Sequence, residues 1–305
     1  MKLFKAAVVI AVILAALLVP FTVRADTSEK DPAAGFTYEA KDGNIVITGY
    51  KGTDTELVIP SEIGGMPVTE IGSDAFYDTF SHSFSDFTSV KIPDTVVYIG
   101  DRAFCGCDHL ESITIPSSVR YTGYGAFSYC TSLTSAVIEK GADHSVRRFA
   151  FKSCTSLTSV SLPDSIDKIE YEAFADCTSL TSIEIPESVT TIENQVFQGC
   201  TALESITIPD SVESIGDWLF RDCPSLSVLI LPEGLETKYS LFPDSMALIR
   251  YKRTDKGMII TEASRGDGSE DITVPGMICG VRVISGKNDE DISSGAGVYV
   301  SPEML

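Results

Sequence analysis

The stretch LTSIEIPESVTTIENQVFQGCTA (residues 180–202) decides the fold, because it is one unit of a pattern that recurs along the chain. Each unit has a cysteine near its end, here Cys200, and the leucine three residues later begins the next unit. The cysteines are Cys107, Cys130, Cys154, Cys177, Cys200 and Cys223, separated by steps of 23, 24, 23, 23 and 23 residues. A fixed period in this range predicts a solenoid, in which each unit is one coil that stacks on the next.

The first part of the unit predicts a short strand. Ile183, Glu184 and Ile185 alternate between apolar and polar side chains, as in a half-buried strand. Pro186 ends the strand, because proline has no N–H to donate to a sheet. The chain then returns past Ile192 to a small or aliphatic residue and a Phe, which predicts a tight bend with one ring pointing into the stack.

The six repeated cysteines share one position and are predicted to form an inward-facing column, in which Cys serves as a small buried apolar residue. We interpret them as buried thiols. Disulfides between neighbouring coils are an alternative, because a spacing of about 5 Å permits the distance, although parallel side chains rarely offer the dihedral angle. A metal site is a weaker alternative, because the C-x-C of Cys105 and Cys107 lacks a further set of ligands.

The full pattern, L-x-S-I-x-I-P-x-S-V-x-x-I-x-x-x-A-F-x-x-C-T-S, resembles the BspA-like leucine-rich repeat, also called the Treponema pallidum type, over residues 57–245. The resemblance implies a β-rich leucine-rich-repeat solenoid. This is a right-handed superhelix of short strands with turns or short helical turns, no long helices, and a strand lining the concave side. It also implies a bacterial surface protein that binds host matrix proteins, such as fibronectin and fibrinogen, or other bacteria. The family offers no catalytic motif.

The N-terminus is typical of an export signal. Lys2 and Lys5 precede an apolar run at 6–19, and Val23-Arg24-Ala25 fits a cleavage site, which predicts a signal peptide at 1–25. An uncleaved anchor is the alternative. We therefore expect a secreted or cell-surface protein that is not inserted in a membrane once the signal is removed.

Both ends of the repeat region carry hairpin-like phrases. Residues 26–56 are predicted to be a linker and a capping hairpin that turns within 36–49 at Asp42-Gly43 and covers the first coil. The solenoid itself is predicted at 57–248, with about eight coils of 23 residues. Residues 249–261 resemble the first hairpin, with Tyr251 matching Tyr38, and 271–285 resemble 56–72. Residues 249–305 therefore indicate a degenerate second array or a C-terminal cap.

Composition narrows the function. A formal net charge of −20 argues against nucleic acid and anionic membranes as partners and leaves extracellular proteins. No cofactor or metal site is predicted, and the acidic loops at 267–271 and 289–291 read as solvated. Asp143, His144 and Ser145 are adjacent, whereas a catalytic triad converges from separate elements. We predict that the chain is not an enzyme, with a hydrolase of glycans or peptides as a weaker alternative.

Two surfaces are predicted to bind. The first is the concave face, formed by the outward-facing side chains of the repeated strands. It is rich in hydroxyl groups, although Ser and Thr also suit a solvated strand that binds nothing. Its candidate residues are Lys91, Glu111, Ser112, Thr114, Ser135, Val137, Ser159, Ser161, Ser182, Glu184, Ser205, Thr207, Val228 and Ile230, the last two as a small apolar patch. The second is an insertion that lengthens the first coil, with candidate residues Tyr77, Phe80, His82, Phe84 and Phe87. Aromatic side chains dominate interface hot spots.

The function predicted from these features is protein–protein binding at the cell surface, including adhesion to host matrix or other cells. A structural spacer, or a fragment of a larger surface protein, is the alternative from a different class. The sequence leaves the oligomeric state open.

Overall fold

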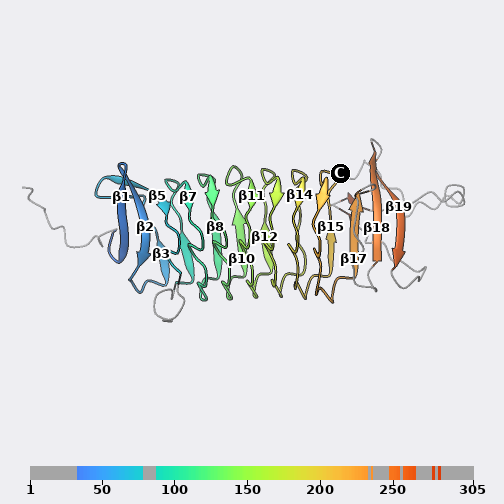
Figure 1. Cartoon of the computed structure of the whole chain (residues 1–305), viewed down its shortest axis with the longest axis horizontal. Helices are drawn as coiled ribbons and strands as arrows, with labels where there is room; N and C mark the ends of the chain where they lie inside the picture. The colour runs from blue at the N-terminus through green and yellow to red at the C-terminus, as the bar shows by residue number, and fades with distance from the viewer. Residues whose placement is uncertain are drawn as a thin grey trace, which may run out of the picture. The chain divides into compact units, whose positions relative to one another are not determined.

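A computed structural model describes residues 33–77, 87–232, 235, 247–254, 257–265, 277–278 and 281–282. The chain divides into two compact units, Met1–Ala34 and Gly35–Leu305, and nearly all described residues lie in the second. The predicted signal peptide at 1–25 lies outside them. Every regular element among the described residues is a β-strand, and none forms an apolar helix of the length that a bilayer requires. The predicted β-solenoid is confirmed (Figure 1).

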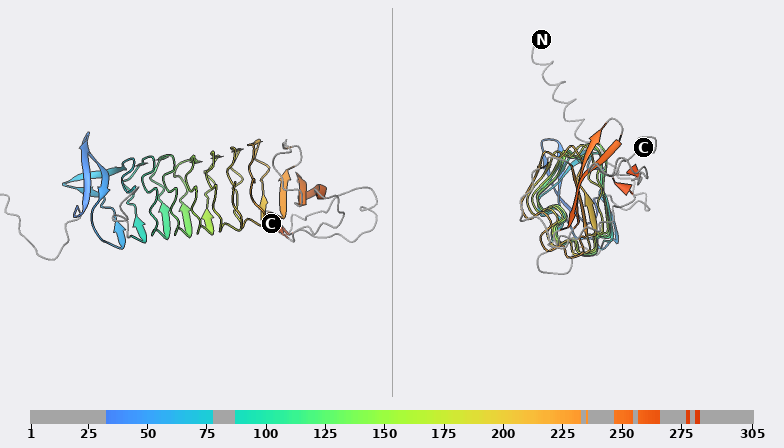
Figure 2. Two further views of the ribbon diagram at one scale, coloured as in Figure 1. Left: turned by 60° about the horizontal axis from the view of Figure 1, so that its bottom comes forward. Right: turned by 90° about the vertical axis from the view of Figure 1, so that its right-hand side faces the viewer.

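The predicted strands of the first five coils form a parallel sheet, with one strand per coil in the order β12-β10-β8-β6-β3. Equivalent residues pair directly, so that Ser135 lies between Ser112 and Ser159. Figure 2 shows the strands of successive coils side by side along the stack. The last regular coils continue through β15, β17 and a hairpin, in the order β15-β17-β18-β19. The bounds are β3 Glu56–Val58, β6 Ser89–Lys91, β8 Ser112–Ile115, β10 Ser135–Ile138, β12 Ser159–Ser161, β15 Ser205–Thr207 and β17 Val228–Pro232.

One predicted strand is not formed. The coil of residues 180–186 has no assigned strand, although Ile183 and Ile185 are buried and Glu184 is exposed, as the alternation predicts. The pattern therefore placed the side chains correctly, whereas the sheet itself is interrupted between β12 and β15.

The return path of each coil is itself a strand, which the sequence did not predict. These strands form parallel ladders of their own, in the orders β2-β5-β7-β9, where β2 is Asn44–Tyr50, and β11-β13-β14-β16. The bounds are β5 Met66–Ile71, β7 Tyr98–Ile99, β9 Tyr121–Thr122, β11 Ser145–Val146, β13 Lys168–Ile169, β14 Thr191–Ile192 and β16 Ser214–Ile215. The short strand β4, Glu62–Ile63, pairs with β5.

The third side of each coil, here called the turn side, holds the predicted bend. Glu172 and Asp176 flank the bend with left-handed backbone, at φ values of 53° and 61°. Their N–H groups donate to carbonyls of the next coil, and so does that of Phe174, whose N lies 3.0 Å from Val196 O. The coils are thus hydrogen-bonded on three sides, which satisfies backbone groups that would otherwise be buried without partners.

The rings of the bends point into the stack, as predicted. Consecutive rings are stacked with centroids 4.8 to 5.9 Å apart and planes within 12° of parallel. The column comprises Phe76, Phe104, Phe127, Phe151, Phe174, Phe197 and Phe220.

The predicted column of buried thiols is confirmed for the described cysteines, which are buried and form no disulfide. Each thiol of the column lies against the carbonyl of the Phe one coil before it. The Sγ atom of Cys177 is 3.1 Å from Phe151 O, and that of Cys223 is 3.0 Å from Phe197 O. This weak S–H···O contact links neighbouring coils without a covalent bond.

The predicted N-terminal hairpin is confirmed. Strands β1, Phe36–Lys41, and β2, Asn44–Tyr50, pair in antiparallel fashion around Asp42 and Gly43. Both turn residues have positive φ, 51° and 80°, as a type I′ turn requires. Strand β2 then pairs in parallel with β5, so the hairpin continues the return ladder beyond the first coil.

The C-terminal strands repeat this cap, as the sequence resemblance predicted. Strands β18, Ala247–Thr254, and β19, Gly257–Arg265, form a second hairpin. Tyr38 pairs with Ile47 and Tyr251 with Ile260, and each pair directly follows an irregularity in the register. The bounds of the next pair are β20 Met277–Ile278 and β21 Val281–Arg282, which pair in antiparallel fashion as β4 and β5 do.

Candidate functional site

The strand face consists of the outward-facing side chains of the repeated strands. The structure places Ser135, Thr207 and Val228 on it as half-buried residues. The predicted residues that are exposed there are Lys91, Glu111, Ser112, Thr114, Val137, Ser159, Ser161, Ser182, Glu184 and Ser205. Parallel register aligns them into columns across the coils. Val137 is an exposed apolar residue of this face, at 39% exposure.

Ile230 pairs in register with Thr207 of this face but is not exposed there, so its prediction as a contact residue was wrong. Its side chain is 3% exposed, and Leu229 and Leu231 on either side of it are fully buried. The prediction assumed the alternation of the other coils. A continuous apolar run, such as Val228 to Leu231, is instead typical of a strand covered on both faces.

Neighbouring hydroxyl groups on the strand side stabilise the stack. The Thr134 hydroxyl donates to Glu111 O at 2.9 Å, and the Thr158 hydroxyl donates to Thr134 O at 3.1 Å. These threonines tie each coil to the one before it. The hydroxyl-rich part of the surface that a partner would meet is therefore the column of serines beside these threonines.

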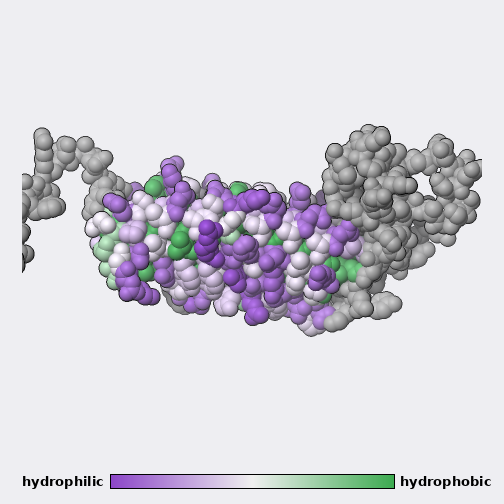
Figure 3. All heavy atoms as spheres, turned by 90° about the horizontal axis from the view of Figure 1, so that it is seen from above, coloured by the Kyte–Doolittle hydropathy of each residue, from purple (hydrophilic) through white to green (hydrophobic). Residues whose placement is uncertain are grey.

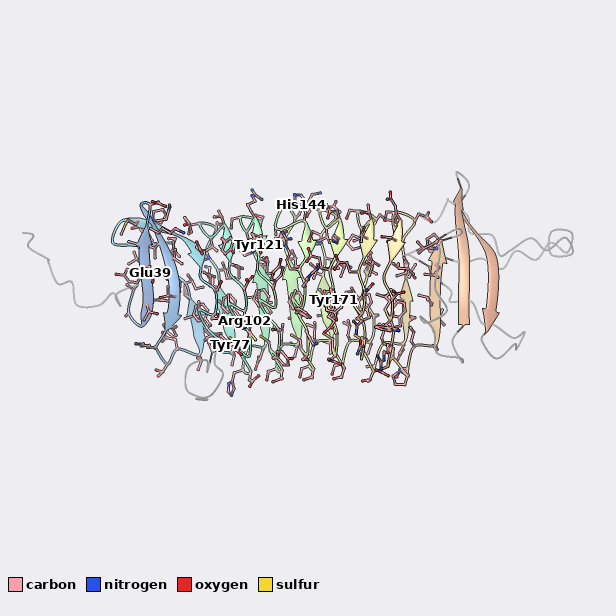
Figure 4. The ribbon with its side chains drawn as sticks, in the orientation of Figure 1. Glu39, Tyr77, Arg102, Tyr121, His144 and Tyr171 are labelled. Atoms are coloured by element: carbon pink, nitrogen blue, oxygen red, sulfur yellow. The ribbon has the colours of Figure 1, made fainter. Side chains whose placement is uncertain are left out.

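The aromatic insertion divides into three parts. Tyr77 is half-buried, with the Arg102 guanidinium 5.3 Å from its ring centroid (Figure 4). Phe80, His82 and Phe84 lie outside the described residues. Phe87 is 1% exposed and packs edge-on against Phe76 at 5.9 Å, so its assignment to a contact surface was wrong. Phe87 occupies the leucine position of its coil, and this register was legible in the sequence.

A groove on the turn side was not predicted. It has a volume of about 1070 Å³ and crosses four coils. Gly106 and Gly125 lie within it, and the side chains around them are Tyr77, Arg102, Tyr124, Tyr129, Phe149 and Lys152. These residues define the turn-side groove.

Two glycines leave room for the groove. Gly125 has a left-handed backbone conformation, and so do Arg102 and Phe149, which occupy the same repeat position in the two adjoining coils. Gly106 likewise stands where the next coil carries Tyr129. A Cβ atom at Gly125 would lie 3.1 Å from the Ser128 hydroxyl oxygen. The sequence signal for this site was therefore glycine at two repeat positions where the adjoining coils carry large side chains.

The cations of the groove are paired. Two guanidinium nitrogens of Arg102 lie 2.8 and 3.0 Å from the Asp74 carboxylate. The Lys152 ammonium forms an ion pair with Glu172 and lies 5.5 Å from the Phe149 ring centroid. The aromatic and cationic side chains therefore hold one another in place at the groove.

No catalytic arrangement forms around His144. The Asp143 carboxylate accepts from Thr122 N at 2.9 Å and from Arg147 Nε at 3.0 Å, whereas His144 Nδ1 lies 3.0 Å from Ser165 O. Across the described ranges, no group of three or more His, Cys, Asp or Glu residues is placed to hold a metal ion. On the side where Figure 4 places His144, Figure 3 shows a largely polar surface with small, separate apolar patches.

The repeat itself is similar to known proteins. The family model of the BspA type leucine rich repeat region matches residues 69–145 and 144–256 in six copies. No curated protein matches the chain.

Among solved structures, a leucine rich cell surface protein from Faecalibacterium prausnitzii is 28% identical, with 71% of each chain covered and a TM-score of 0.45. The T. pallidum leucine rich repeat protein is 30% identical over 67% of this chain and 72% of its own, with a TM-score of 0.34. A leucine-rich repeat protein from Eubacterium ventriosum is 24% identical over 72% of this chain and 54% of its own, with a TM-score of 0.51, and shares the fold.

Proposed function

Because this chain belongs to the BspA-type leucine-rich repeat family, we propose that it is a bacterial cell-surface protein whose solenoid binds other proteins outside the cell. The observation that carries the proposal is the strand face, whose exposed side chains repeat in register from coil to coil. A surface that many coils share can bury the ~800 Å² per partner that a stable interface needs.

The finer proposal is adhesion to proteins of the host matrix or to other cells. It is supported by the flat, in-register surface, on which many modest contacts add together. The acidic chain, with a net charge of −20, favours partners with a basic contact surface, and salt should weaken such binding.

Surface plasmon resonance of the purified chain over fibronectin, fibrinogen, laminin and collagen, with a salt series, tests this proposal. The variant Val137→Arg with Ser159→Arg places two bulky charges on the strand face. The control Val97→Arg with Ser214→Arg makes the same changes at exposed positions elsewhere. We expect the first variant to weaken binding about tenfold, or ~1.4 kcal/mol, and the control to bind normally. Equal binding by all three proteins, or none by the folded chain, would contradict the proposal.

A structural spacer is the second candidate, and the repeated cap favours it. The β18–β19 hairpin pairs with the last coil through β18 and has the register of the β1–β2 hairpin that begins the first array. A hairpin of this kind could join one repeat array to a second array, and a protein built of several arrays in series would serve as a spacer. A spacer predicts no saturable binding to any of the four matrix proteins.

A further inference from the structure

We propose that the turn-side groove binds a neutral oligosaccharide. The groove crosses four coils, and strands in a sheet are about 5 Å apart, so it runs for about 15 Å, the length of a short sugar chain. Its volume of about 1070 Å³ is slightly above the range of roughly 300–1,000 Å³ that is usual for small-ligand sites, as an elongated ligand requires. A ligand of this size fits better than the broad surface of a folded protein.

The rings at the groove offer flat apolar surfaces. Tyr124 and Tyr129 are 48% and 51% exposed. Phe149 is held edge-on against Tyr171, with centroids 5.4 Å apart. Exposed Tyr rings combine an apolar face with a polar tip. A pyranose ring has the complementary form, because its C–H face is apolar and hydroxyl groups surround it.

Polar groups lie beside the rings, where sugar hydroxyls can bond to them. Asp101, Asp108 and Thr131 are among the lining residues. Asp101 Oδ1 accepts a hydrogen bond from Tyr124 N at 2.9 Å, and the Thr131 hydroxyl donates to Asp108 Oδ1 at 3.2 Å. Carboxylate oxygens accept hydrogen bonds from hydroxyl donors, and Tyr hydroxyls both donate and accept. Rings and hydrogen-bonding groups in one groove suit a ligand that has both apolar faces and hydroxyl groups.

Charge argues against an anionic ligand. The groove is lined by two acids, Asp101 and Asp108, and two cations, Arg102 and Lys152, in a chain whose net charge is −20. Each cation is already paired with a further carboxylate, that of Asp74 or Glu172. An anionic sugar or a phosphate would therefore find no uncompensated positive charge and would be repelled by the lining acids, whereas a neutral sugar incurs no such penalty.

An array of neutral and acidic oligosaccharides, probed with the purified full chain, tests this proposal. Titration calorimetry on the best neutral ligand follows. The variant Tyr124→Ala with Tyr129→Ala removes two groove rings. The control Tyr38→Ala with Trp218→Ala removes two rings of similar exposure outside it, at 43% and 47%. We expect the groove variant to lose about tenfold or more in affinity and the control to bind normally.

The proposal is overturned if no neutral oligosaccharide binds, if only acidic ones bind, or if the groove variant binds as tightly as the unchanged chain. The variant Tyr124→Phe with Tyr129→Phe keeps the rings and should retain most of the affinity. If the double alanine variant does not fold, the single variants Tyr124→Ala and Tyr129→Ala carry the comparison with the control. The strand-face variant with Val137→Arg and Ser159→Arg should still bind the sugar, which separates this site from the proposed protein-binding face.

Discussion

At the scale of single residues, the Phe column is the most closely packed feature of the stack. Phe174 is fully buried, and its ring stacks on those of Phe151 and Phe197 at 5.6 and 5.8 Å. Phe174→Ala should lower the free energy of unfolding by about 3–5 kcal/mol, because it leaves a cavity between two rings. Tyr124→Ala, at a half-exposed site, should cost less than about 1 kcal/mol. Denaturant titration of both variants measures this, and equal losses would contradict the packing argument.

The cysteine column makes stability depend on alkaline pH. Burial raises the pKa of the Cys223 thiol from 9.0 to about 11. The unfolded chain then loses this proton at lower pH than the folded chain, so the contribution is intact below pH 9 and is lost as pH rises to about 11. At ~1.4 kcal/mol per pKa unit, the free energy of unfolding falls by roughly 2–3 kcal/mol over this range.

Cys223→Ala isolates this effect from the other groups that titrate in the same range. We expect its free energy of unfolding, measured by denaturant titration from pH 8 to pH 11, to fall less steeply than that of the unchanged chain. Parallel curves for the two proteins would show that the thiol ionises equally in the folded and unfolded states.

At the scale of elements, the spacing of the return ladder depends on glycine. A Cβ atom at Gly123 would lie 2.3 Å from Asp101 N, whereas one at Gly43, in the hairpin turn, meets nothing within 4 Å. Gly123→Ala should therefore cost about 3 kcal/mol, because backbone must move. Gly43→Ala should cost about 1 kcal/mol through its positive φ alone. Thermal unfolding of both variants checks the order, and a larger shift for Gly43→Ala would refute it.

The sequence predicted the elements whose signals are local. Asp42-Gly43 specified the first hairpin, and the spacing of cysteine and Phe specified the columns. The two-residue return strands escaped prediction, because a strand such as Thr191–Ile192 is defined by its neighbours rather than by its own alternation.

The groove escaped prediction for a related reason. Gly106 and Gly125 read as ordinary turn residues when the chain is followed in one dimension. Alignment of the coils by their repeat shows that the adjoining coils carry Arg102, Tyr129 and Phe149 at those positions, but only the stacked structure shows that the missing side chains open a groove. Phe87 and Ile230 were misplaced because an aromatic cluster and a strand alternation were given more weight than repeat register and a continuous apolar run.

At the scale of the whole molecule, a solenoid has to manage its two ends. Each coil buries its apolar residues only against its neighbours, so an uncovered end is a point of weakness. The first array begins with the β1–β2 hairpin, which extends the return ladder. Its last coil is covered along β17 by β18, in a parallel register of five residue pairs from Val228 with Ala247 to Pro232 with Tyr251.

Removal of residues 247–305 should therefore loosen the last coil more than the rest. In a nearest-neighbour stack, each interface adds its own stability, so losing the β17–β18 interface acts first on β17 and decays along the array. We expect amide hydrogen exchange in β17 to rise about tenfold or more, that in β15 to rise less, and that in β8 to stay unchanged. A uniform rise in all three strands would show instead that the array opens as one cooperative unit, so that the cap stabilises every coil equally.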